Sequence, residues 1–247
     1  CRAVVLADLH NKKYGRDNEM LLNAIRAEKP DLILVAGDML TSRPGRSFKT
    51  ALRLLEELKK EYPVYYGNGN HEQRLKLYPE YYGDMAERYG KALGEMGIEP
   101  LVNACARLEE YGLTVWGVEI DRSFYKRFHT RQMPPEYMGE VLGAPDGDTC
   151  NVLLAHNPDC FPQYAAWGAD LVLSGHVHGG VIRVPLWGKG VVSPSVRLFP
   201  HYDGGRYEEA GSVMFLSRGL GTHTIPFRLF NTRELLVVDF HPNKNLS

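Results

Sequence analysis

Residues 3–10 read Ala-Val-Val-Leu-Ala-Asp-Leu-His, and residues 32–38 read Leu-Ile-Leu-Val-Ala-Gly-Asp. In both stretches an unbroken apolar run comes before a side chain that can bind metal. A short apolar run of this kind is typical of a strand buried on both faces of a parallel sheet. We therefore expect two core strands, at residues 3–7 and 32–36, with polar groups at their carboxyl ends.

The first third of the chain alternates predicted strands and helices. Asp17 is a candidate cap for the first helix, which has to end before Pro30. The other expected elements are an amphipathic helix at Ser47–Lys60, a third strand at Val64–Tyr66 and a helix from Pro79 to Met96. A β-α-β-α-β order implies parallel strands joined by right-handed crossovers.

The middle of the chain differs in pattern. The strand-like runs Ala104–Leu108 and Leu113–Val118 flank a turn, which predicts a hairpin. Residues 119–149 are polar and rich in Pro and Gly, with a short helix near Glu136–Leu142, and we interpret them as an active-site flap. Further strands are expected at Val152–Ala155, Leu171–Leu173, Val181–Val184, Ser212–Leu216 and Leu235–Phe240, with a helix at Pro158–Trp167. We expect residues 1–247 to form one domain with two sheets.

Composition limits the classes of partner. The chain has 247 residues, a net charge of -1 and 44% hydrophobic residues, which is ordinary for a globular protein with a large core. Without an overall basic field, a nucleic-acid partner is not expected. We interpret one local basic run as a solvated surface. It consists of Arg122, Lys126, Arg127 and Arg131.

No segment approaches the about 18 apolar residues that a membrane span requires. The chain nevertheless begins directly on a predicted core strand, so we expect upstream residues in the full protein that hold a signal or an anchor. That would make the protein membrane-associated or extracytoplasmic; without such a segment we expect a cytoplasmic protein. The four cysteines form no Cys-x-x-Cys pair, and we expect buried free thiols, with a disulfide left open for an extracytoplasmic protein.

Metal-binding side chains recur at the predicted strand ends. They lie in Asp8-Leu9-His10, Gly37-Asp38, Gly69-Asn70-His71-Glu72, His156 and Gly175-His176-Val177-His178. Open α/β sheets form their sites at the carboxyl ends of the strands, so these segments are expected to converge. Each alone is commonly a hydrogen-bonded loop or a turn. The five in order predict a site for two metal ions.

The spacing leaves several ligand arrangements open. Asp8 and His10 are two apart, so in extended backbone they project to one side and could chelate one ion. His176 and His178 repeat this spacing, although a loop could direct them to separate ions. The carboxylate of Asp38 has two oxygens and could bridge two cations. Nitrogen and oxygen donors without a thiolate favour Mn²⁺, Fe or Zn²⁺ over Ca²⁺ alone or Cu⁺.

The five segments together resemble the calcineurin-like metallophosphoesterases. The pattern of that family is Asp-x-His, Gly-Asp, Gly-Asn-His-Glu/Asp, a separate His and Gly-His-x-His, and all five blocks occur here in order. The chain is also similar to the bacterial YkuE/YaeI-like branch. In that branch Gly-His-x-His-Gly-Gly leads into a strand, here Val181-Ile182-Arg183, and a later segment matches residues 217–221, Ser-Arg-Gly-Leu-Gly.

The resemblance implies a fold and a set of roles. The fold would be a four-layer α/β/β/α sandwich with two central mixed sheets. One ion would be bound by Asp8, His10, Asp38 and His178, and the other by Asp38, Asn70, His156 and His176. His71 would not bind metal; it would face the scissile phosphate and protonate or stabilise the leaving oxygen.

The implied activity is a dinuclear metal-dependent phosphoesterase. It would hydrolyse phosphodiester or pyrophosphate bonds by in-line attack of a metal-bridging hydroxide. A phosphomonoesterase of the same fold is the first alternative, and a non-catalytic scaffold is a second. Mn²⁺ is the preferred cofactor, with Fe or Zn²⁺ as alternatives.

The resemblance also suggests a substrate class. We expect a small-molecule, lipid-linked or cell-wall phosphoester, no nucleic acid, and membrane association through a segment upstream of Cys1. Arg183 and Arg218 are candidate phosphate contacts because a guanidinium suits bidentate phosphate binding, with a structural role as the alternative for each. His201 and His223 are candidates for the edge of the pocket.

Overall fold

The expected core strands lie side by side in one parallel group. The computed structural model describes residues 1–125, 132–180, 182–183, 190–192, 200–222 and 228–241. Strands β1 (Arg2–Leu6), β2 (Leu32–Ala36), β3 (Val64–Gly67) and β4 (Pro100–Leu101) are parallel neighbours, and β13 (Leu236–Asp239) pairs antiparallel with β1. The predicted β-α-β-α-β order is confirmed.

A second sheet of six strands faces the first. Its order is β11 (Gly205–Glu209), β12 (Ser212–Leu216), β8 (Leu171–Ser174), β7 (Cys150–Leu154), β6 (Leu113–Gly117) and β5 (Ala104–Leu108). The four central strands are parallel, and each edge strand is antiparallel to its neighbour. The predicted hairpin is therefore present as β5 and β6. A separate small ladder joins β9 (Ile182–Arg183) to β10 (Gly190–Val192).

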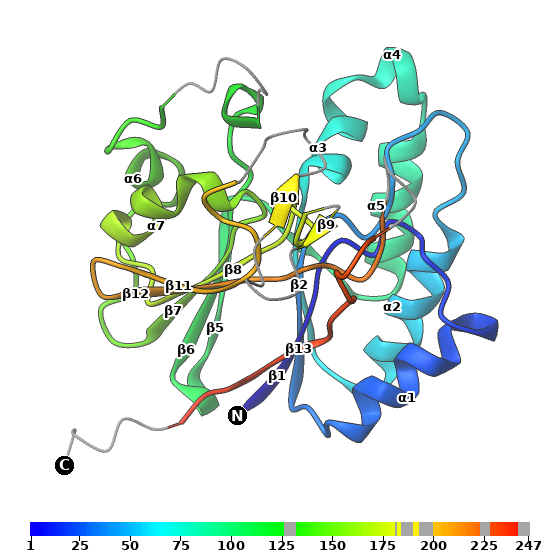
Figure 1. Cartoon of the computed structure of the whole chain (residues 1–247), viewed down its shortest axis with the longest axis horizontal. Coiled ribbons are helices and arrows are strands. Elements are labelled where there is room, and N and C mark those ends of the chain that lie inside the picture. Colours follow the sequence, from blue (N-terminus) through cyan, green and yellow to red (C-terminus); the bar gives the residue numbers. More distant parts are fainter. Residues whose placement is uncertain (126–131, 181, 184–189, 193–199, 223–227, 242–247) are drawn as a thin grey trace.

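Helices cover the outer face of each sheet, so the fold has the four layers that the family resemblance implied (Figure 1). The first sheet carries α1 (Glu19–Ala27), α2 (Lys49–Glu61), α3 (Asn70–Leu77), α4 (Pro79–Tyr82) and α5 (Met85–Glu95). The second carries α6 (Tyr137–Leu142) and α7 (Phe161–Trp167). Short 3-10 turns complete the described chain: η1 (Arg16–Asn18), η2 (Glu109–Tyr111), η3 (Arg122–Tyr125) and η4 (Pro158–Cys160).

Alternation along each strand divides the core into three apolar clusters. In β1, Val5 packs between the sheets, while Val4 and Leu6 pack against the helices. This is the period-two geometry of a strand. Both faces of β1 are covered, which explains why its sequence is continuously apolar.

Two glycines allow the two sheets to approach. A Cβ added to Gly67 would lie 2.7 Å from Leu154 Cβ, and one added to Gly117 would lie 2.2 Å from the backbone oxygen of Leu101. Leu101 belongs to β4 in the first sheet and Gly117 to β6 in the second. The spacing between the layers at this point therefore depends on the absence of a side chain.

Several local predictions were wrong. Asp17 does not cap α1; its φ is 50° and its carboxylate pairs with Arg53 at 2.8 Å. The single helix expected from Pro79 breaks at Gly83, whose φ of 57° cannot continue a right-handed helix. Of the four cysteines, which are all free, only Cys160 is buried, and Cys105 is exposed on the edge strand β5.

The segment interpreted as a flap is described at 119–125 and 132–149. Its apolar side chains Ile120, Phe124, Met133 and Met138 belong to the core cluster beside the second sheet. The described residues leave out part of the basic run, namely Lys126, Arg127 and Arg131. They also leave out both ends of the predicted strand 181–184, Val181 and Val184. Within the described part of the chain, none of the helices has the length and hydrophobicity needed to cross a bilayer.

The close approach at Gly117 generates a stability prediction. We expect Gly117→Ala to lower the free energy of unfolding by about 1–3 kcal/mol, because the added methyl group forces the sheets apart. The measurement is urea unfolding followed by circular dichroism. Gly90→Ala is the matched control: its Cβ meets nothing within 4 Å in an exposed part of α5, so it should stabilise by about 0.5–1 kcal/mol. Equal effects of the two substitutions would contradict this account of the sheet contact.

Candidate metal centre

The candidate ligands come from loops that follow strands of both sheets. Asp8 and His10 follow β1, Asp38 follows β2, and Asn70 and His71 begin α3 shortly after β3. From the second sheet, His156 follows β7, and His176 and His178 follow β8. All but His176, which is partly buried, are buried.

The backbone at these positions is strained. Asp8, His10, Asp38, His176 and His178 have φ values between 49° and 75°, in the left-handed region. That conformation costs a residue other than glycine roughly 1–2 kcal/mol. Strained backbone of this kind is concentrated at sites where side chains have to be aimed. The strain at these five positions agrees with a functional site, although residues such as Lys29 and Ala210 share it elsewhere in the chain.

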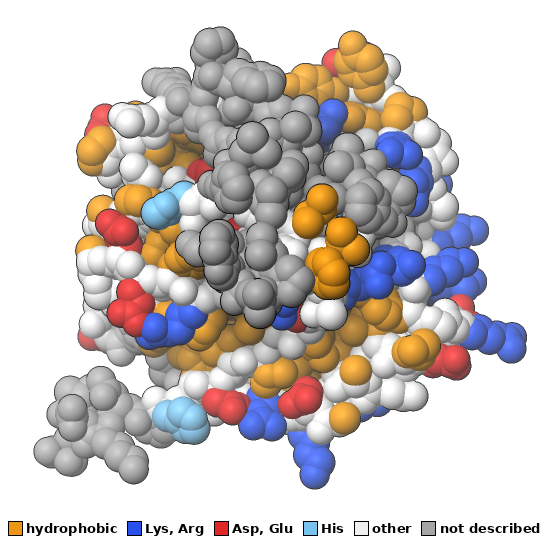
Figure 2. All heavy atoms as spheres, in the orientation of Figure 1, with side chains coloured by type: hydrophobic (Ala, Val, Ile, Leu, Met, Phe, Trp, Pro, Cys, Tyr) orange, Lys and Arg blue, Asp and Glu red, His pale blue; other side chains and the backbone are white. Residues whose placement is uncertain are grey.

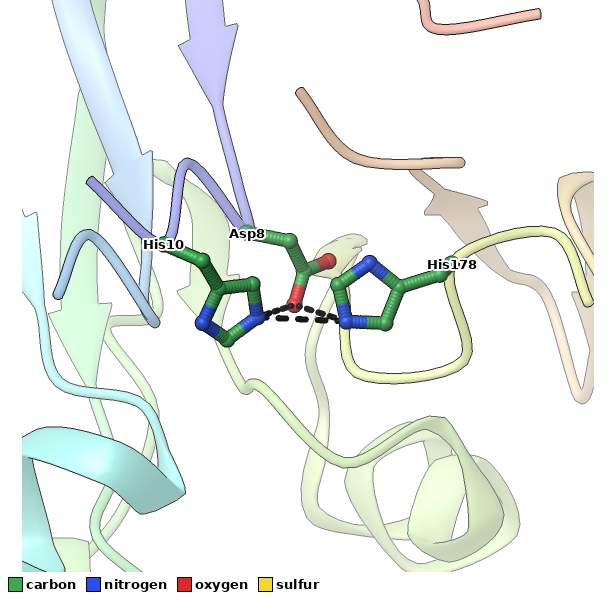
Figure 3. A group of neighbouring side chains, drawn as sticks. All are labelled: Asp8, His10 and His178. Carbon is green, nitrogen blue, oxygen red and sulfur yellow. Dashed lines mark hydrogen bonds and ion pairs between the residues drawn. The ribbon is translucent and has the colours of Figure 1, made fainter. Parts of the chain in front are cut away.

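Asp8, His10 and His178 form one compact group (Figure 3). Asp8 Oδ1 lies 3.6 Å from His10 Nε2 and 3.5 Å from His178 Nε2, and the two Nε2 atoms are 3.2 Å apart. The backbone amide of His176 donates to the Asp8 carboxylate at 3.0 Å, which joins the β1 loop to the β8 loop. The three ligand atoms converge on one point.

Asp38, His156 and His176 form a second group. His156 Nε2 lies 3.1 Å from Asp38 Oδ2, and His10 Nε2 of the first group lies 3.8 Å from the same oxygen. Asp38 thus lies between the two groups. His176 and His178 belong to different groups, which is the division that the resemblance implies; metal binding by each residue stays a prediction.

Hydrogen bonds behind the rings orient three of the imidazoles. Nδ1 of His10 lies 3.2 Å from Leu40 O, Nδ1 of His156 lies 2.7 Å from Ala36 O, and Nδ1 of His178 lies 3.2 Å from Gly221 O. A carbonyl oxygen can only accept, so in the neutral rings of His10 and His156 the Nδ1 carries the proton and the Nε2 turns a lone pair toward the groups. This is the tautomer that a metal ligand needs. His178 Nδ1 also lies 3.4 Å from Arg228 Nη2, which can only donate, so the two contacts of His178 favour different tautomers.

His71 has the opposite arrangement. The backbone amide of Ser42 donates to His71 Nδ1 at 2.9 Å, and Ser42 Oγ lies 2.7 Å from the same atom. Because Nδ1 accepts, a neutral His71 carries its proton on Nε2, which lies 3.9 Å from Asp38 Oδ2. A neutral His71 therefore presents an N–H donor where neutral His10 and His156 present a lone pair, although the ligand atom of His71 also lies close to those of His10 and Asp38.

The charges of the groups depend on one another. Burial favours a raised pKa for Asp8 and Asp38, but the surrounding imidazoles, His178 for Asp8 and His156 for Asp38, hold both pKa values below the ordinary range. Burial favours a lowered pKa for His156, yet the Asp38 carboxylate raises it to about 10. Burial and the neighbouring His156 lower the pKa of His176 to about 4. In the metal-free protein, protons on histidine balance the two buried carboxylates.

Asn70 Oδ1 is buried at the centre and lacks a hydrogen-bond partner. Leaving such an atom unsatisfied costs about 1–3 kcal/mol. It therefore indicates that a ligand binds here. Buried carboxylate, amide and imidazole donors with preset tautomers fit a dinuclear metal site.

Glu72 fixes the loops that carry these donors. Its carboxylate accepts the backbone amides of Asp38 at 3.0 Å, Met39 at 2.8 Å and Gly69 at 3.0 Å, together with the Tyr66 hydroxyl at 3.0 Å. Burial and the Asp38 carboxylate raise the pKa of Glu72 to about 7. One side chain thereby joins the β2 loop to the start of α3.

The arginines predicted to contact substrate have partners in the fold. Arg183 Nη1 donates to Gly179 O at 2.9 Å and to Asp203 O at 2.8 Å, and Arg218 Nη2 pairs with Glu234 at 2.6 Å. Their substrate contacts stay a prediction. His201 is exposed and its ring packs on Tyr202, and His223 lies outside the described residues.

Two other arginines lie nearer the groups and were missed from the sequence. Arg122 Nη1 lies 3.4 Å from the backbone oxygen of Asn70, and Arg228 Nη2 lies 3.4 Å from His178 Nδ1. Each has a buried Nε without a hydrogen-bond partner. A sequence feature could have pointed to Arg122, because this residue begins the basic run in the segment interpreted as a flap. No sequence feature pointed to Arg228.

Comparison with known proteins agrees with this geometry. Residues 1–180 match the family described as calcineurin-like phosphoesterase. The chain is 24% identical to the uncharacterized metallophosphoesterase Cj0846 of Campylobacter jejuni, covering 98% of this chain and 60% of that protein. It is 24% identical to the uncharacterized metallophosphoesterase YkuE of Bacillus subtilis (96% and 77% covered) and 26% identical to the phosphodiesterase YaeI of Escherichia coli (76% and 64% covered). The chain thus spans less than two thirds of the length of two of these relatives.

The balance of buried charges predicts a metal-dependent stability. At a Mn²⁺ concentration 100-fold above the dissociation constant, each bound ion should stabilise the protein by about 3 kcal/mol, which is on the order of 10 °C in unfolding temperature for a domain of this size. Differential scanning fluorimetry after chelation measures the shift. Asp38→Asn removes the charge between the two groups, so this variant should lose most of the rise in unfolding temperature that Mn²⁺ causes. An unchanged rise would contradict the central place of Asp38.

The shift in unfolding temperature that Mn²⁺ causes should also depend on pH. The folded-state pKa of His156, about 10, exceeds the ordinary 6.5, so its charged form stabilises the metal-free protein fully below pH 6.5. That contribution is lost as the pH rises through about 10. Metal binding requires the neutral ring, so the shift caused by Mn²⁺ should grow between pH 6.5 and 9.

Proposed function

The chain belongs to the calcineurin-like phosphoesterase family, and from this premise we propose that it hydrolyses phosphodiester or pyrophosphate bonds with two bound metal ions. It is a metallophosphoesterase with buried Asp and His clusters. The proposal concerns the bond that is cut, the metal and the role of each side chain.

One observation carries the proposal: the hydrogen bonding of His71 is opposite to that of His10 and His156. In their neutral forms, His10 and His156 each offer an Nε2 lone pair to a cation, while Nε2 of a neutral His71 offers an N–H donor beside them. Hydrolysis of a phosphoester needs both functions, because charge on the phosphoryl oxygens has to be neutralised and the leaving oxygen has to be stabilised by a hydrogen-bond donor. A scaffold without catalytic activity needs neither.

The chain's own residues have distinct tasks in this mechanism. Asp8, His10, Asp38 and His178 would hold one ion, and Asp38, Asn70, His156 and His176 the other. When bound, the two ions would supply charge neutralisation and an activated water for in-line attack. His71 would donate a hydrogen bond from its Nε2–H that stabilises the leaving oxygen, which takes its proton from water, and Ser42 keeps the ring in the donating tautomer.

The donor set and one relative support the finer assignment. Imidazole and carboxylate donors without thiolate suit Mn²⁺, with Fe or Zn²⁺ as alternatives. A relative that is 26% identical is named a phosphodiesterase, which favours a diester over a monoester. Hydrolysis of bis(4-nitrophenyl) phosphate and 4-nitrophenyl phosphate with added Mn²⁺ tests the assignment. Activity on the monoester alone would make the protein a phosphomonoesterase, and inactivity on both with metals bound would overturn the proposal.

Arg122 is the side chain best placed to bind the phosphoryl group. Its guanidinium lies 5.9 Å over the Tyr125 ring, and that ring contacts the His176 ring at 5.3 Å. Among the described residues it makes no ion pair, although it is half-buried. A guanidinium in that environment is stabilised by an anion, and phosphate suits its fork of donors.

The segment that carries Arg122 is held in place on several sides. Gln73 Nε2 donates to Ile120 O at 2.8 Å, Asn157 Nδ2 donates to Phe124 O at 3.0 Å, and the Tyr137 hydroxyl accepts from the Asp121 amide at 2.9 Å. Helix α3, α6 and the β7 loop thus all fix η3. This arrangement suits a residue that binds substrate in a set geometry.

Removing the hydrogen-bond donor of His71 should separate catalysis from metal binding. We expect His71→Ala to lower kcat about 10²–10⁴-fold for a diester with an alkoxide leaving group, and less for 4-nitrophenolate, which leaves without a proton. Elemental analysis should find both metals retained. Ser42→Ala is the graded control, because the Ser42 backbone amide still donates to Nδ1 and the loss should be smaller. A metal-free His71→Ala protein would contradict the division of roles.

Removing Arg122 should weaken the hold on the phosphoryl group. Arg122→Ala is expected to lower kcat/KM by about 10–100-fold with the metal content unchanged, since a charge-assisted contact contributes roughly 1.5–3 kcal/mol. Arg122→Lys should recover only part, because lysine lacks the planar fork. The exposed Arg107, which pairs with Asp146, is the matched control, and Arg107→Ala should leave kcat/KM unchanged. Equal losses at both positions would exclude a specific role for Arg122.

A further inference from the structure

The turn Leu229–Phe230 exposes large apolar side chains at an unfavourable backbone position. The exposed fractions are 45% for Leu229 and 64% for Phe230. Phe230 also has a φ of 55°, in the left-handed region, which is rare for a bulky residue. Asparagine or glycine at this position would relieve both costs. Phe230 combines a strained backbone with an apolar ring that is left in water, which indicates a function other than packing in the folded core.

This turn is attached directly to the metal-binding loop. Asn231 Nδ2 donates to His178 O at 2.7 Å and also to Gly180 O, and Arg228 lies beside His178. The Arg183 amide donates to Leu229 O at 3.0 Å. Residues on both sides of Phe230 are therefore anchored, and the exposed ring is held next to the candidate metal centre.

Exposed basic side chains gather next to the turn. Lys12, Lys13 and Arg16 lie on the loop after β1, and the Tyr14 hydroxyl of that loop bonds to the backbone oxygen of Leu220. The neighbouring loop after β2 adds Arg43 and Arg46, and the segment after the turn adds Arg233. Figure 2 shows a group of hydrophobic side chains beside the grey, undescribed residues, with Lys and Arg side chains next to that group.

Among the described residues of these segments, acidic side chains are fewer than basic ones. Asp17 is engaged by Arg53 at 2.8 Å and lies 3.9 Å from Arg16, and Glu19 is the other carboxylate that begins α1. The face therefore combines a net positive charge with a protruding apolar turn. We call this surface, made of Lys12, Lys13, Arg16, Arg43, Arg46, Leu229, Phe230 and Arg233, the basic apolar face.

We infer that the basic apolar face docks on a bilayer that contains anionic phospholipids. Lys and Arg side chains are attracted to the anionic headgroups, and an exposed aromatic turn enters the interface between headgroups and acyl chains. A nucleic acid would use the charge but would give no reason to keep Phe230 strained and exposed. Docking would turn the metal centre toward the headgroups, so a lipid-linked phosphoester would reach it; that consequence rests on the proposed function, whereas bilayer binding does not.

Vesicle sedimentation tests the inference without reference to activity. The metal-loaded chain is mixed with vesicles of phosphatidylcholine alone or with 30% phosphatidylglycerol, in low and in high salt. We expect binding to the anionic vesicles that salt weakens, and little binding to phosphatidylcholine. The double substitution Lys12→Gln with Lys13→Gln should weaken binding about 25-fold, at about fivefold for each charge near the surface. The matched control substitutes exposed lysines elsewhere, Lys29→Gln with Lys91→Gln, and should bind like the parent protein.

Phe230→Asn separates docking from folding. Asparagine tolerates the left-handed backbone, so the unfolding temperature should stay equal or rise while vesicle binding falls about tenfold or more. Tyr81→Asn, at a residue 67% exposed on α4, is the aromatic control and should bind normally. Unchanged binding by Phe230→Asn would overturn the inference, whatever its stability. Binding to an oligonucleotide without binding to vesicles would overturn it in favour of a nucleic-acid surface.

Discussion

The buried carboxylate of Glu72 is the interaction on which the rest of the site depends. It accepts backbone amides from the Asp38 loop and from the residue before α3, and it lies within the core beside Tyr66 and Tyr89. These amides have no strand or helix partner of their own, so without Glu72 they would be unsatisfied in a dry environment. The side chain therefore sets where Asp38 and His71 lie relative to each other. The Asp38 carboxylate completes the link by accepting the His71 amide at 2.8 Å.

Apart from Glu72, most features of the site lower the stability of the folded protein. Two buried carboxylates lie among imidazoles, Asn70 Oδ1 has no partner, and the loops adopt left-handed backbone. Such costs are tolerated because the two sheets beneath the loops are close-packed and fix the strand ends. Glycines make this possible where loops touch: a Cβ on Gly69 would lie 2.2 Å from Asp38 Oδ1, and one on Gly175 would lie 2.5 Å from Asp8 Oδ2. The glycines of the motifs thus give the carboxylates their room.

The sequence predicted two sheets and the converging ligands because both follow from periodicity and strand order, and the four layers were implied by the family resemblance. Continuous apolar runs located β1, β2, β7 and β8, and parallel strands place their carboxyl ends together. The sequence did not predict α3, because Gly69, Asn70 and His71 are residue types that are common in turns. The helix start becomes evident only from the structure, in which the Gly69 amide donates to the Glu72 carboxylate. The break at Gly83 follows from the positive φ of that glycine, which the helical pattern did not reveal, and the pairing of Asp17 with Arg53 is a contact between distant residues. Arg122 and Arg228 could not be assigned either, because their significance lies in which side chains they approach.

Asymmetry around the imidazoles links the fold to the chemistry. Leu40 O and Ala36 O are backbone acceptors at loop positions, so the chain path itself determines that the neutral rings of His10 and His156 present lone pairs. His71 instead meets a backbone donor, because the β2 loop continues through Ser42 and turns its amide toward the ring. Ring tautomer is therefore encoded by the course of the backbone rather than by residue type. A substitution that redirected the β2 loop would change the function of His71 without altering any residue that meets metal or substrate.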